Sequence, residues 1–379
     1  MTSKERLMTA LNHREPDKIP HAIGSAGNNI NVNLYKELLN HFGIKDENNK
    51  TLRKHFQTVS SCEMLLQKIH CDVRELSGVT KTEGTTREWE DRESFFSQDE
   101  WGAVYRMPKS SGYYYDLYKA SRERTFENEN DEPYEFPGPP AVLTGSVEKA
   151  KALKEAGYPV VITMQYGNGF LQTGPRVYGY EDWLMMLATD DRRSGYFMEK
   201  LLEMKIRVWD KIMEVYGDYV DILGEYDDLG TQLGPFIDPK MMRKKIKPYY
   251  KKLFDHIHNK YGAKVYFHSC GSVAKMIPDL IETGVDFLNP VQTSAEGMDP
   301  AWLKKEFGRD ICFWGGGIDT QRILPRGTKQ EIRDNVKRNI EIFGRDGGYV
   351  FCPIHNVQGD VPLENFLTMW ETFMLERNY

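Results

Sequence analysis

Short apolar runs alternate with amphipathic stretches from residue 140 onward, and this alternation constrains the fold more than any other feature. The runs are rich in β-branched and aromatic residues, and each passes into a polar or glycine-containing segment. Buried strands that alternate with helices pair in parallel. Six such units favour a closed α/β barrel over an open sheet. The runs are 158–169, 219–230, 263–272, 284–292, 310–319 and 347–356.

The N-terminal part of the chain has a different character. Residues 3–12 predict a short helix, and residues 19–24 predict a first strand. Residues 81–140 are dense in Glu, Asp, Trp and Tyr without a helical period, which indicates an insertion that contains a hairpin. We therefore predict a single (β/α)8 TIM barrel domain over residues 1–379, with an N-terminal helical segment and an inserted hairpin region at about 81–140.

Charge and composition exclude several classes of protein. Lys plus Arg number 50 against 56 acidic residues, a net charge of -6 that argues against non-specific nucleic-acid binding. No apolar run approaches the roughly 18 residues that span a bilayer, and the N-terminus lacks the pattern of a signal peptide. We expect a cytoplasmic protein without membrane contact. Its five irregularly spaced cysteines predict buried thiols or metal ligands rather than disulfides.

His268 and Cys270 stand at the end of one predicted strand. Residues i and i+2 of a strand share a face, so both side chains can enter the barrel mouth, where barrel enzymes do their chemistry. Catalytic zinc sites use three protein ligands of this type, although a hydrogen-bonded histidine beside a buried thiol is the alternative. Cys352 and His355 end the last strand, and either could be the third ligand. We expect Cys352, because a second thiolate suits zinc, with His355 as the alternative.

Three carboxylates, those of Glu225, Asp227 and Asp228, crowd another predicted strand end. Glu225 and Asp227 are two residues apart and are expected to share a face. Carboxylates gathered in a cleft can act as acid, base or ligand, so both are candidate catalytic residues. Glu225 is the expected auxiliary zinc ligand. Helix capping or a solvated loop is the alternative for either residue.

Aromatic and amide side chains decorate further strand ends and predict a small, partly aromatic ligand. Ordinary packing is the alternative for any one of them. The candidate substrate-binding residues are Gln165, Tyr166, Phe170, Gln292, Trp314 and His355.

Several segments resemble the uroporphyrinogen decarboxylase superfamily. They include KERLMTALNHREPDKIP, VYFHSCGSVAKMIPDLIETGVDFLNPVQ, FWGGGIDTQRILPRGT and HNVQGDVPLENF. The resemblance covers essentially the whole chain and implies one (β/α)8 barrel with its cleft at the carboxyl ends of the strands. The decarboxylase itself has an arginine-rich motif near its N-terminus. Here that region reads HAIGSAGNNI (21–30), without arginine, so a substrate with many carboxylates would lack its counter-charges.

The pair His268-x-Cys270 resembles the zinc site of the methyltransferase branch, which includes corrinoid:coenzyme M methyltransferases and methoxyl-demethylating enzymes. Aligned through residues 362–365, the family's third cysteine falls on His355, with Cys352 three residues earlier. A corrinoid-binding D-x-H-x-x-G signature is absent, so the resemblance implies that a separate corrinoid protein carries the methylcobalamin. The expected activity is zinc-dependent transfer of a methyl group between this corrinoid and a small methoxylated aromatic or thiol.

Two other functions are compatible with the same residues. One is a metal-free decarboxylase or lyase that uses Asp227 and His355. The other is a non-enzymatic barrel that binds a corrinoid or tetrapyrrole. Metal content separates the first of these from the methyltransferase, and turnover separates the second.

Overall fold

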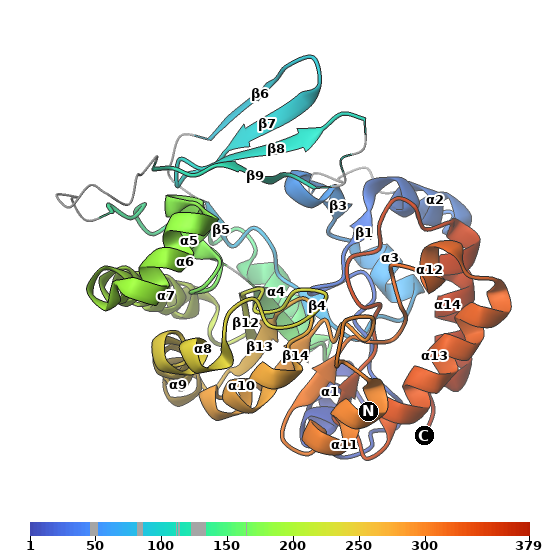
Figure 1. Cartoon of the computed structure of the whole chain (residues 1–379). Coiled ribbons are helices and arrows are strands. Elements are labelled where there is room, and N and C mark those ends of the chain that lie inside the picture. Colours follow the sequence, from blue (N-terminus) through green and yellow to red (C-terminus); the bar gives the residue numbers. More distant parts are fainter. Residues whose placement is uncertain (46–51, 82–85, 111, 113, 123–133, 164) are drawn as a thin grey trace.

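A parallel sheet occupies the centre of the molecule (Figure 1). The computed structural model describes residues 1–45, 52–81, 86–110, 112, 114–122, 134–163 and 165–379. All neighbouring strands of this sheet run parallel, as the strand–helix alternation predicts. Their spatial order is β16 (Tyr349–Val350), β15 (Cys312–Trp314), β14 (Phe287–Asn289), β13 (Lys264–His268), β12 (Ile222–Tyr226), β11 (Val160–Thr163) and β4 (Arg74–Glu75).

Residues 20–22 close the gap between the two edge strands. On one side His21 pairs in parallel with Phe351, and Ala22 N–H donates to the Phe351 carbonyl at 3.0 Å. On the other side Asp72 N–H donates to the His21 carbonyl at 3.0 Å. This segment lies where the sequence predicts the first strand. With the seven strands of the sheet it completes a ring of eight parallel segments, and the predicted (β/α)8 barrel is confirmed.

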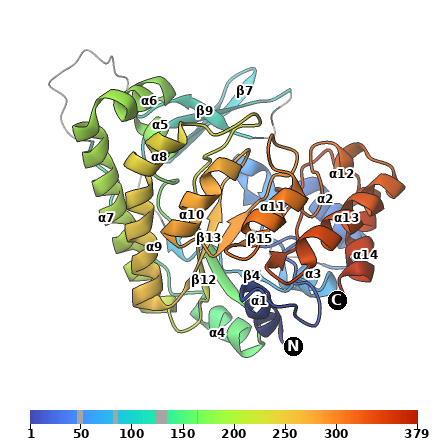
Figure 2. The same ribbon diagram turned by 60° about the horizontal axis from the view of Figure 1, so that its bottom comes forward.

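Helices cover the outside of the ring (Figure 2). Asp238 caps α8 (Pro239–Lys245) by accepting from Lys240 N–H, and Gly262 ends α9 (Lys247–Tyr261) in the left-handed conformation. Aspartate and glycine are the residue types expected at these two positions. Within the described ranges, no helix is both long enough and apolar enough to cross a bilayer. The helices are α1 (Ser3–Leu11), α2 (Val32–Phe42), η1 (Lys54–Phe56), α3 (Glu63–Lys68), α4 (Val147–Glu155), α5 (Thr173–Tyr178), α6 (Tyr180–Thr189), α7 (Asp191–Tyr216), α8 (Pro239–Lys245), α9 (Lys247–Tyr261), η2 (Ala274–Met276), α10 (Ile277–Thr283), α11 (Pro300–Phe307), α12 (Ile323–Arg326), α13 (Lys329–Gly344) and α14 (Leu363–Glu376).

The region after β4 forms a separate antiparallel sheet on one side of the barrel (Figure 1). Asp99 lies in the turn between β7 (Ser94–Gln98) and β8 (Val104–Pro108). It forms an ion pair with Arg176 of α5 at 2.7 Å, which fastens this sheet to the carboxyl end of the barrel. The expected hairpin is β8 and β9, and two further strands extend it. The remaining strands are β1 (Ile30–Asn31), β2 (Leu52–Arg53), β3 (Thr58–Val59), β5 (Thr80–Lys81), β6 (Arg87–Glu90), β7 (Ser94–Gln98), β8 (Val104–Pro108), β9 (Asp116–Lys119) and β10 (Ala141–Val142).

A buried ionic cluster fastens both ends of the chain beside the closing segment. Asp72 accepts hydrogen bonds from the guanidinium groups of Arg6 at 2.6 Å and Arg377 at 2.7 Å, and all three side chains are almost inaccessible. The N- and C-termini accordingly lie near each other (Figure 2). Each buried charge has a partner of opposite sign, which offsets its desolvation.

The buried His21 predicts a pH-dependent stability. Burial, with the nearby Arg377 guanidinium second, lowers its pKa to about 3, while an unfolded histidine titrates near 6.5. The neutral ring therefore stabilises the fold above pH 6.5, and this contribution is lost as the pH falls from 6.5 towards 3. Between pH 7 and pH 5 we expect this residue alone to remove about 2 kcal/mol from the free energy of unfolding.

Urea titrations at both pH values measure this contribution. His21→Gln should lose less stability between pH 7 and pH 5 than the wild type does. His41→Gln, a surface substitution, should follow the wild type. Equal slopes for all three proteins would contradict the prediction.

Candidate metal centre

Three potential metal ligands meet at the carboxyl end of the barrel. His268 ends β13, Cys270 follows two residues later, and His355 follows β16. Their ligand atoms all lie within 4.8 Å of one another. His268 Nε2 is 3.3 Å from Cys270 Sγ, and the two imidazole rings are 5.5 Å apart between centroids. The barrel thus brings together donors from two strand ends that 85 residues of sequence separate.

A hydrogen-bond chain fixes the orientation of His268. Asn289 Nδ2 donates to the Trp314 carbonyl at 2.8 Å, so the amide oxygen of Asn289 points to the imidazole and accepts from its Nδ1–H. Nδ1 therefore carries the proton, and the lone pair lies on Nε2, which faces Cys270. Metal-binding histidines characteristically donate their other ring N–H in this way.

The electrostatics of these three residues suit a zinc ion. Burial lowers the pKa of both histidines, to about 4 for His355, so their rings are neutral at pH 7 and can act as ligands. Burial, with Asp228 second, raises the pKa of the Cys270 thiol, because no positive charge compensates a thiolate there. A bound dication would supply that compensation. Two imidazoles and one thiol, with room for a fourth ligand, match a catalytic zinc site.

The structure changes the order of preference for the third ligand. Cys352 is fully buried at the end of β16, and it is not among the clustered donors of the described residues. Its backbone carbonyl accepts from Gly317 N–H at 2.9 Å, which holds it in the core. His355, three residues later, lies at the mouth of the barrel and is one of the three clustered donors. We expected Cys352 because a second thiolate suits zinc. The chain must leave β16 before one of its side chains can reach His268, and His355 lies beyond the end of that strand.

A cavity of about 200 Å³ opens beside the cluster. Tyr226 stacks on the His268 ring with centroids 4.7 Å apart, so one wall continues directly from the metal ligands. Among the residues predicted from sequence, Asp227, His268 and His355 line this cavity. The full lining is Gly27, Asn29, Phe56, Asn168, Gln172, Tyr226, Asp227, Asp228, His268, His355 and Asn356.

Asp227 borders the cavity, and its carboxylate is held by donors of the protein itself. Its carboxylate accepts from the backbone N–H groups of Leu171 and Gln172, both at 2.8 Å, and from Tyr250 Oη at 2.6 Å. Burial outweighs these three donors and raises the pKa of Asp227 to about 6. Its neighbour Asp228 was not among the predicted catalytic residues, but its Oδ1 accepts from Cys270 N–H at 2.9 Å.

Glu225 does not reach the metal centre. Its carboxylate accepts hydrogen bonds from Lys205 Nζ at 2.6 Å and from Trp209 Nε1 at 2.8 Å, both on α7. Strand alternation sends Tyr226 towards the cavity and Glu225 outwards, into the layer between β12 and α7. Glu225 thus differs from Asp227, which borders the cavity.

Five predicted substrate-binding residues lie outside the cavity lining. Tyr166 Oη donates to a backbone carbonyl of the insertion at 2.6 Å, and Trp314 is fully buried against Tyr266. Gln292 uses its amide oxygen to accept from Gly271 N–H. Contacts of this kind are those of packed side chains, the alternative that the sequence leaves open for each of these residues. The five are Gln165, Tyr166, Phe170, Gln292 and Trp314.

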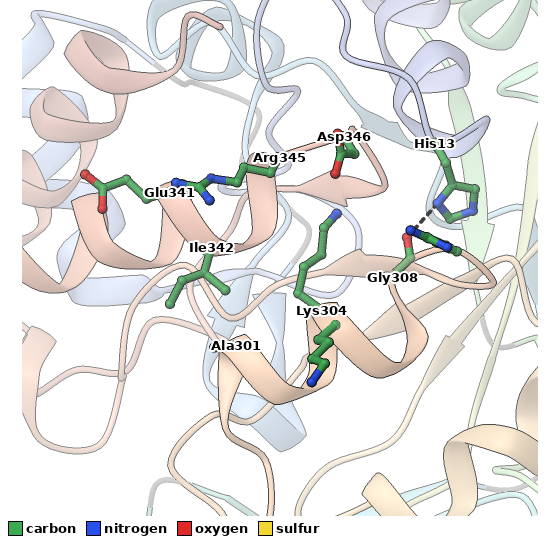
Figure 3. A pocket seen from close by; sticks show the side chains of 10 residues that line it. His13, Ala301, Lys304, Gly308, Glu341, Ile342, Arg345 and Asp346 are labelled. Atoms are coloured by element: carbon green, nitrogen blue, oxygen red, sulfur yellow. Dashed lines mark hydrogen bonds between the residues drawn. The ribbon is translucent and has the colours of Figure 1, made fainter.

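A second, larger cavity of about 690 Å³ lies at the opposite end of the barrel, and Figure 3 shows the side chains that line it. It is formed where α11 and α13 end and the chain enters the next strand, with His13 Nδ1 near the Gly308 carbonyl. Lys304, Arg309 and Arg345 line it, and cations are favourable beside helix carboxyl ends. The smaller cavity carries the candidate ligands and the raised carboxyl pKa, so we assign the functional site there.

Asn289 provides a test of the His268 orientation. Asn289→Leu removes the acceptor for Nδ1–H, and we expect zinc affinity to fall about 10- to 100-fold in competition titrations with a chelator. Asn339→Leu is the matched control, since this buried amide donates to the Gly316 carbonyl and does not contact His268. Equal zinc affinity in both variants would contradict the role of Asn289.

Comparison with known proteins agrees with this architecture. A methyltransferase from Methanosarcina mazei is similar in structure, with a TM-score of 0.65 and 14% identity over 99% of both chains. A 3-keto-D-glucoside 4-epimerase from E. coli matches 61% of this chain and 84% of its own with 13% identity, but its TM-score of 0.38 is too low to support an argument. The first similarity establishes the fold alone.

The sequence itself identifies the family. No curated protein matches the chain. The model of the uroporphyrinogen decarboxylase (URO-D) family matches residues 170–374, which is more than half of the 379 residues and includes all three clustered donors. The resemblance that the sequence motifs indicate is thereby confirmed, and the chain belongs to the uroporphyrinogen decarboxylase family.

Proposed function

We propose that this protein is a zinc-dependent methyltransferase that moves a methyl group between a small substrate and a corrinoid carried by a separate protein. The observation that carries the proposal is the cluster of His268, Cys270 and His355 beside a cavity at the barrel mouth. These residues would hold the zinc ion. When bound, zinc supplies Lewis acidity towards a substrate thiol or ether oxygen.

For a methyl ether, the reaction needs the residues that surround the cluster. The bond between oxygen and the methyl carbon breaks, the methyl group passes to reduced cobalt of the corrinoid, and the oxygen keeps the bonding electron pair. That oxygen then takes a proton to become a hydroxyl group. Asp227 lines the cavity and has a pKa of about 6, so it can exchange a proton there near neutral pH.

The size and lining of the cavity support a corrinoid on a partner protein. A volume of about 200 Å³ lies below the 300–1,000 Å³ that is typical of sites for drug-sized ligands. This volume favours a small substrate over a tetrapyrrole macrocycle. The carboxylates of a porphyrinogen would, moreover, meet Asp227 and Asp228 in this cavity.

Metal analysis and a methyl-transfer assay test the proposal together. Purified protein should contain about one zinc per chain by mass spectrometry, as three protein ligands imply. With 2-methoxyphenol as donor and chemically reduced cobalamin as acceptor, the absorbance change of cobalt methylation should depend on that zinc. Protein without zinc that decarboxylates a small acid would instead favour the metal-free decarboxylase or lyase.

A further inference from the structure

The larger cavity, at the end of the barrel away from the metal centre, is lined by an excess of positive side chains (Figure 3). Four cations and two carboxylates border its volume of about 690 Å³. The whole chain carries a net charge of -6, so this excess of positive charge is local. The cations are Lys304, Lys305, Arg309 and Arg345, and the carboxylates are Glu341 and Asp346.

None of these four cations forms an ion pair with an acidic side chain of the described residues. The basic helices α8 and α9 show the contrasting arrangement, since five of their lysines each pair with a carboxylate. The positive charge of those helices is thus compensated within the protein, whereas the charge around the cavity is available to a ligand. The five pairs are Lys244 and Lys245 with Asp191, Lys247 with Asp279, Lys251 with Asp255, and Lys252 with Glu199.

The carboxyl ends of α11 and α13 account for part of this positive charge. Each helix end carries about half a negative charge, which favours cations beside it. Two helix ends and two carboxylates together carry about three negative charges, fewer than the four cations that line the cavity. Arg309 and Arg345, moreover, lie beyond the last residues of the two helices. An uncompensated positive charge therefore remains at the cavity.

Lys304 is held in a position to bind an anion. Its Nζ donates to the Gly347 carbonyl at 2.6 Å, which engages one of its three N–H groups and leaves two. In Figure 3 its side chain points away from α11, towards Arg345 and Asp346. Burial lowers the pKa of Lys304, because the ammonium group loses part of its hydration. An anion that accepts from the two remaining N–H groups would restore the lost stabilisation.

The cavity also contains acceptors for hydroxyl groups. Asp346 lines it, and the Asp346 carboxylate accepts no hydrogen bond from the described residues. His13 Nδ1 lies 2.9 Å from the Gly308 carbonyl, so Nδ1 carries the proton and Nε2 keeps its lone pair. Burial lowers the pKa of His13, so its ring is neutral at pH 7. A ligand with both an anionic group and hydroxyl groups matches this lining.

The size of the cavity favours an organic ligand over a free ion. Its volume of about 690 Å³ lies within the 300–1,000 Å³ that is typical of sites for drug-sized ligands. A single inorganic phosphate would leave most of this space empty. Ala301 and Ile342 add an apolar part to the lining. The cavity therefore suits an anionic group with an attached organic part.

We propose that this cavity binds a phosphate monoester of about the size of a nucleotide, with its phosphate group on Lys304, Arg309 and Arg345. Lysine and arginine bind phosphate oxygens through charge-assisted hydrogen bonds, which are stronger than neutral ones. Asp346 and His13 accept from hydroxyl groups of the organic part. The site lies at the opposite end of the barrel from the candidate metal centre, and it does not depend on the proposed methyl transfer.

Three probes separate the contributions of the phosphate and the organic part. They are adenosine monophosphate, adenosine, which lacks the phosphate, and inorganic phosphate, which lacks the organic part. Titration calorimetry with the zinc-loaded full chain, without added divalent cations, measures their binding. We expect adenosine monophosphate to bind about tenfold or more tightly than either of the others, because only this probe uses both parts of the cavity.

Substitutions of the cations assign the binding to this cavity. The double variant Arg309→Gln with Arg345→Gln removes two exposed cations and should weaken binding of adenosine monophosphate about tenfold or more, with an unchanged melting temperature. Lys304→Met should weaken binding similarly. The matched control is Lys244→Gln with Lys251→Gln, which removes the same charge from lysines that are paired within the protein. Its affinity should stay within about twofold of the wild type.

A phosphate group could also bind to zinc at the other end of the barrel, and the variants distinguish the two places. Unchanged affinity in the folded double variant of Arg309 and Arg345 would locate the ligand elsewhere and overturn the proposal. Equal weakening in the control variant would show an effect of net charge alone, which would overturn it too. Failure of adenosine monophosphate to bind, or equal binding of adenosine or inorganic phosphate, would refute the ligand class.

Discussion

Cys270→Ala is expected to abolish zinc binding and methyl transfer together while the barrel stays folded. The thiolate is the sole anionic donor of the proposed set, and two imidazoles alone would hold the dication weakly. Zinc content should fall below about a tenth of an equivalent after dialysis, since three protein ligands are the usual requirement. The melting temperature of the metal-free protein should be unchanged, because Cys270 is partly exposed and its side chain does not belong to the hydrophobic core.

The third ligand is decided by a matched pair of variants. His355→Ala should lose zinc as Cys270→Ala does, since its ring lies within 4.8 Å of the other donors. Cys352→Ala should keep zinc and lose only packing, at a cost of about 1 kcal/mol for a small buried side chain. The opposite pattern would make Cys352 the ligand, and retention of zinc in both variants would place the third donor elsewhere.

The barrel was predictable because its signals are local and repeated. Each buried strand from residue 158 onward is visible in the sequence as a run of apolar residues, which is followed by a polar or glycine-containing segment. The helix ends were predictable for the same reason, because Asp238 and Gly262 cap the helix turn that lies next to them in sequence. The closing segment 20–22 is shorter. It pairs with Phe351 and contacts Asp72, which are both distant from it in sequence, so only its strand character could be predicted.

The site was predictable where two donors are close in sequence, and unpredictable where the residues come from distant segments. His268 ends β13 and Cys270 follows two residues later, so their proximity could be predicted. Asn289 pairs with His268 where β13 and β14 lie side by side. The register between two strands cannot be predicted from a local sequence pattern, so the contact between Asn289 and His268 could not be predicted. Asn29 borders the cavity from a segment far in sequence from His268, so no local pattern predicts its position.

Glu225 offers the second test with a large expected effect, because its predicted catalytic role and its observed environment lead to opposite results. Glu225 and Lys205 form a 2.6 Å ion pair with side chains 3% and 1% exposed. Removing one partner of a buried pair leaves an uncompensated charge, which costs about 3–5 kcal/mol. We therefore expect Glu225→Gln to lower the free energy of unfolding by about this amount while zinc stoichiometry stays at one.

The double variant Lys205→Met with Glu225→Gln supplies the control. It removes both charges, and the glutamine oxygen can still accept from Trp209 Nε1. Replacement of a buried ion pair by groups of similar volume is often neutral, so this variant should recover at least about half of the lost stability. Chemical denaturation and zinc analysis of the single and double variants measure both quantities. Loss of zinc in Glu225→Gln without loss of stability would restore Glu225 as a metal ligand, because a residue that only compensates Lys205 cannot affect zinc in a folded protein.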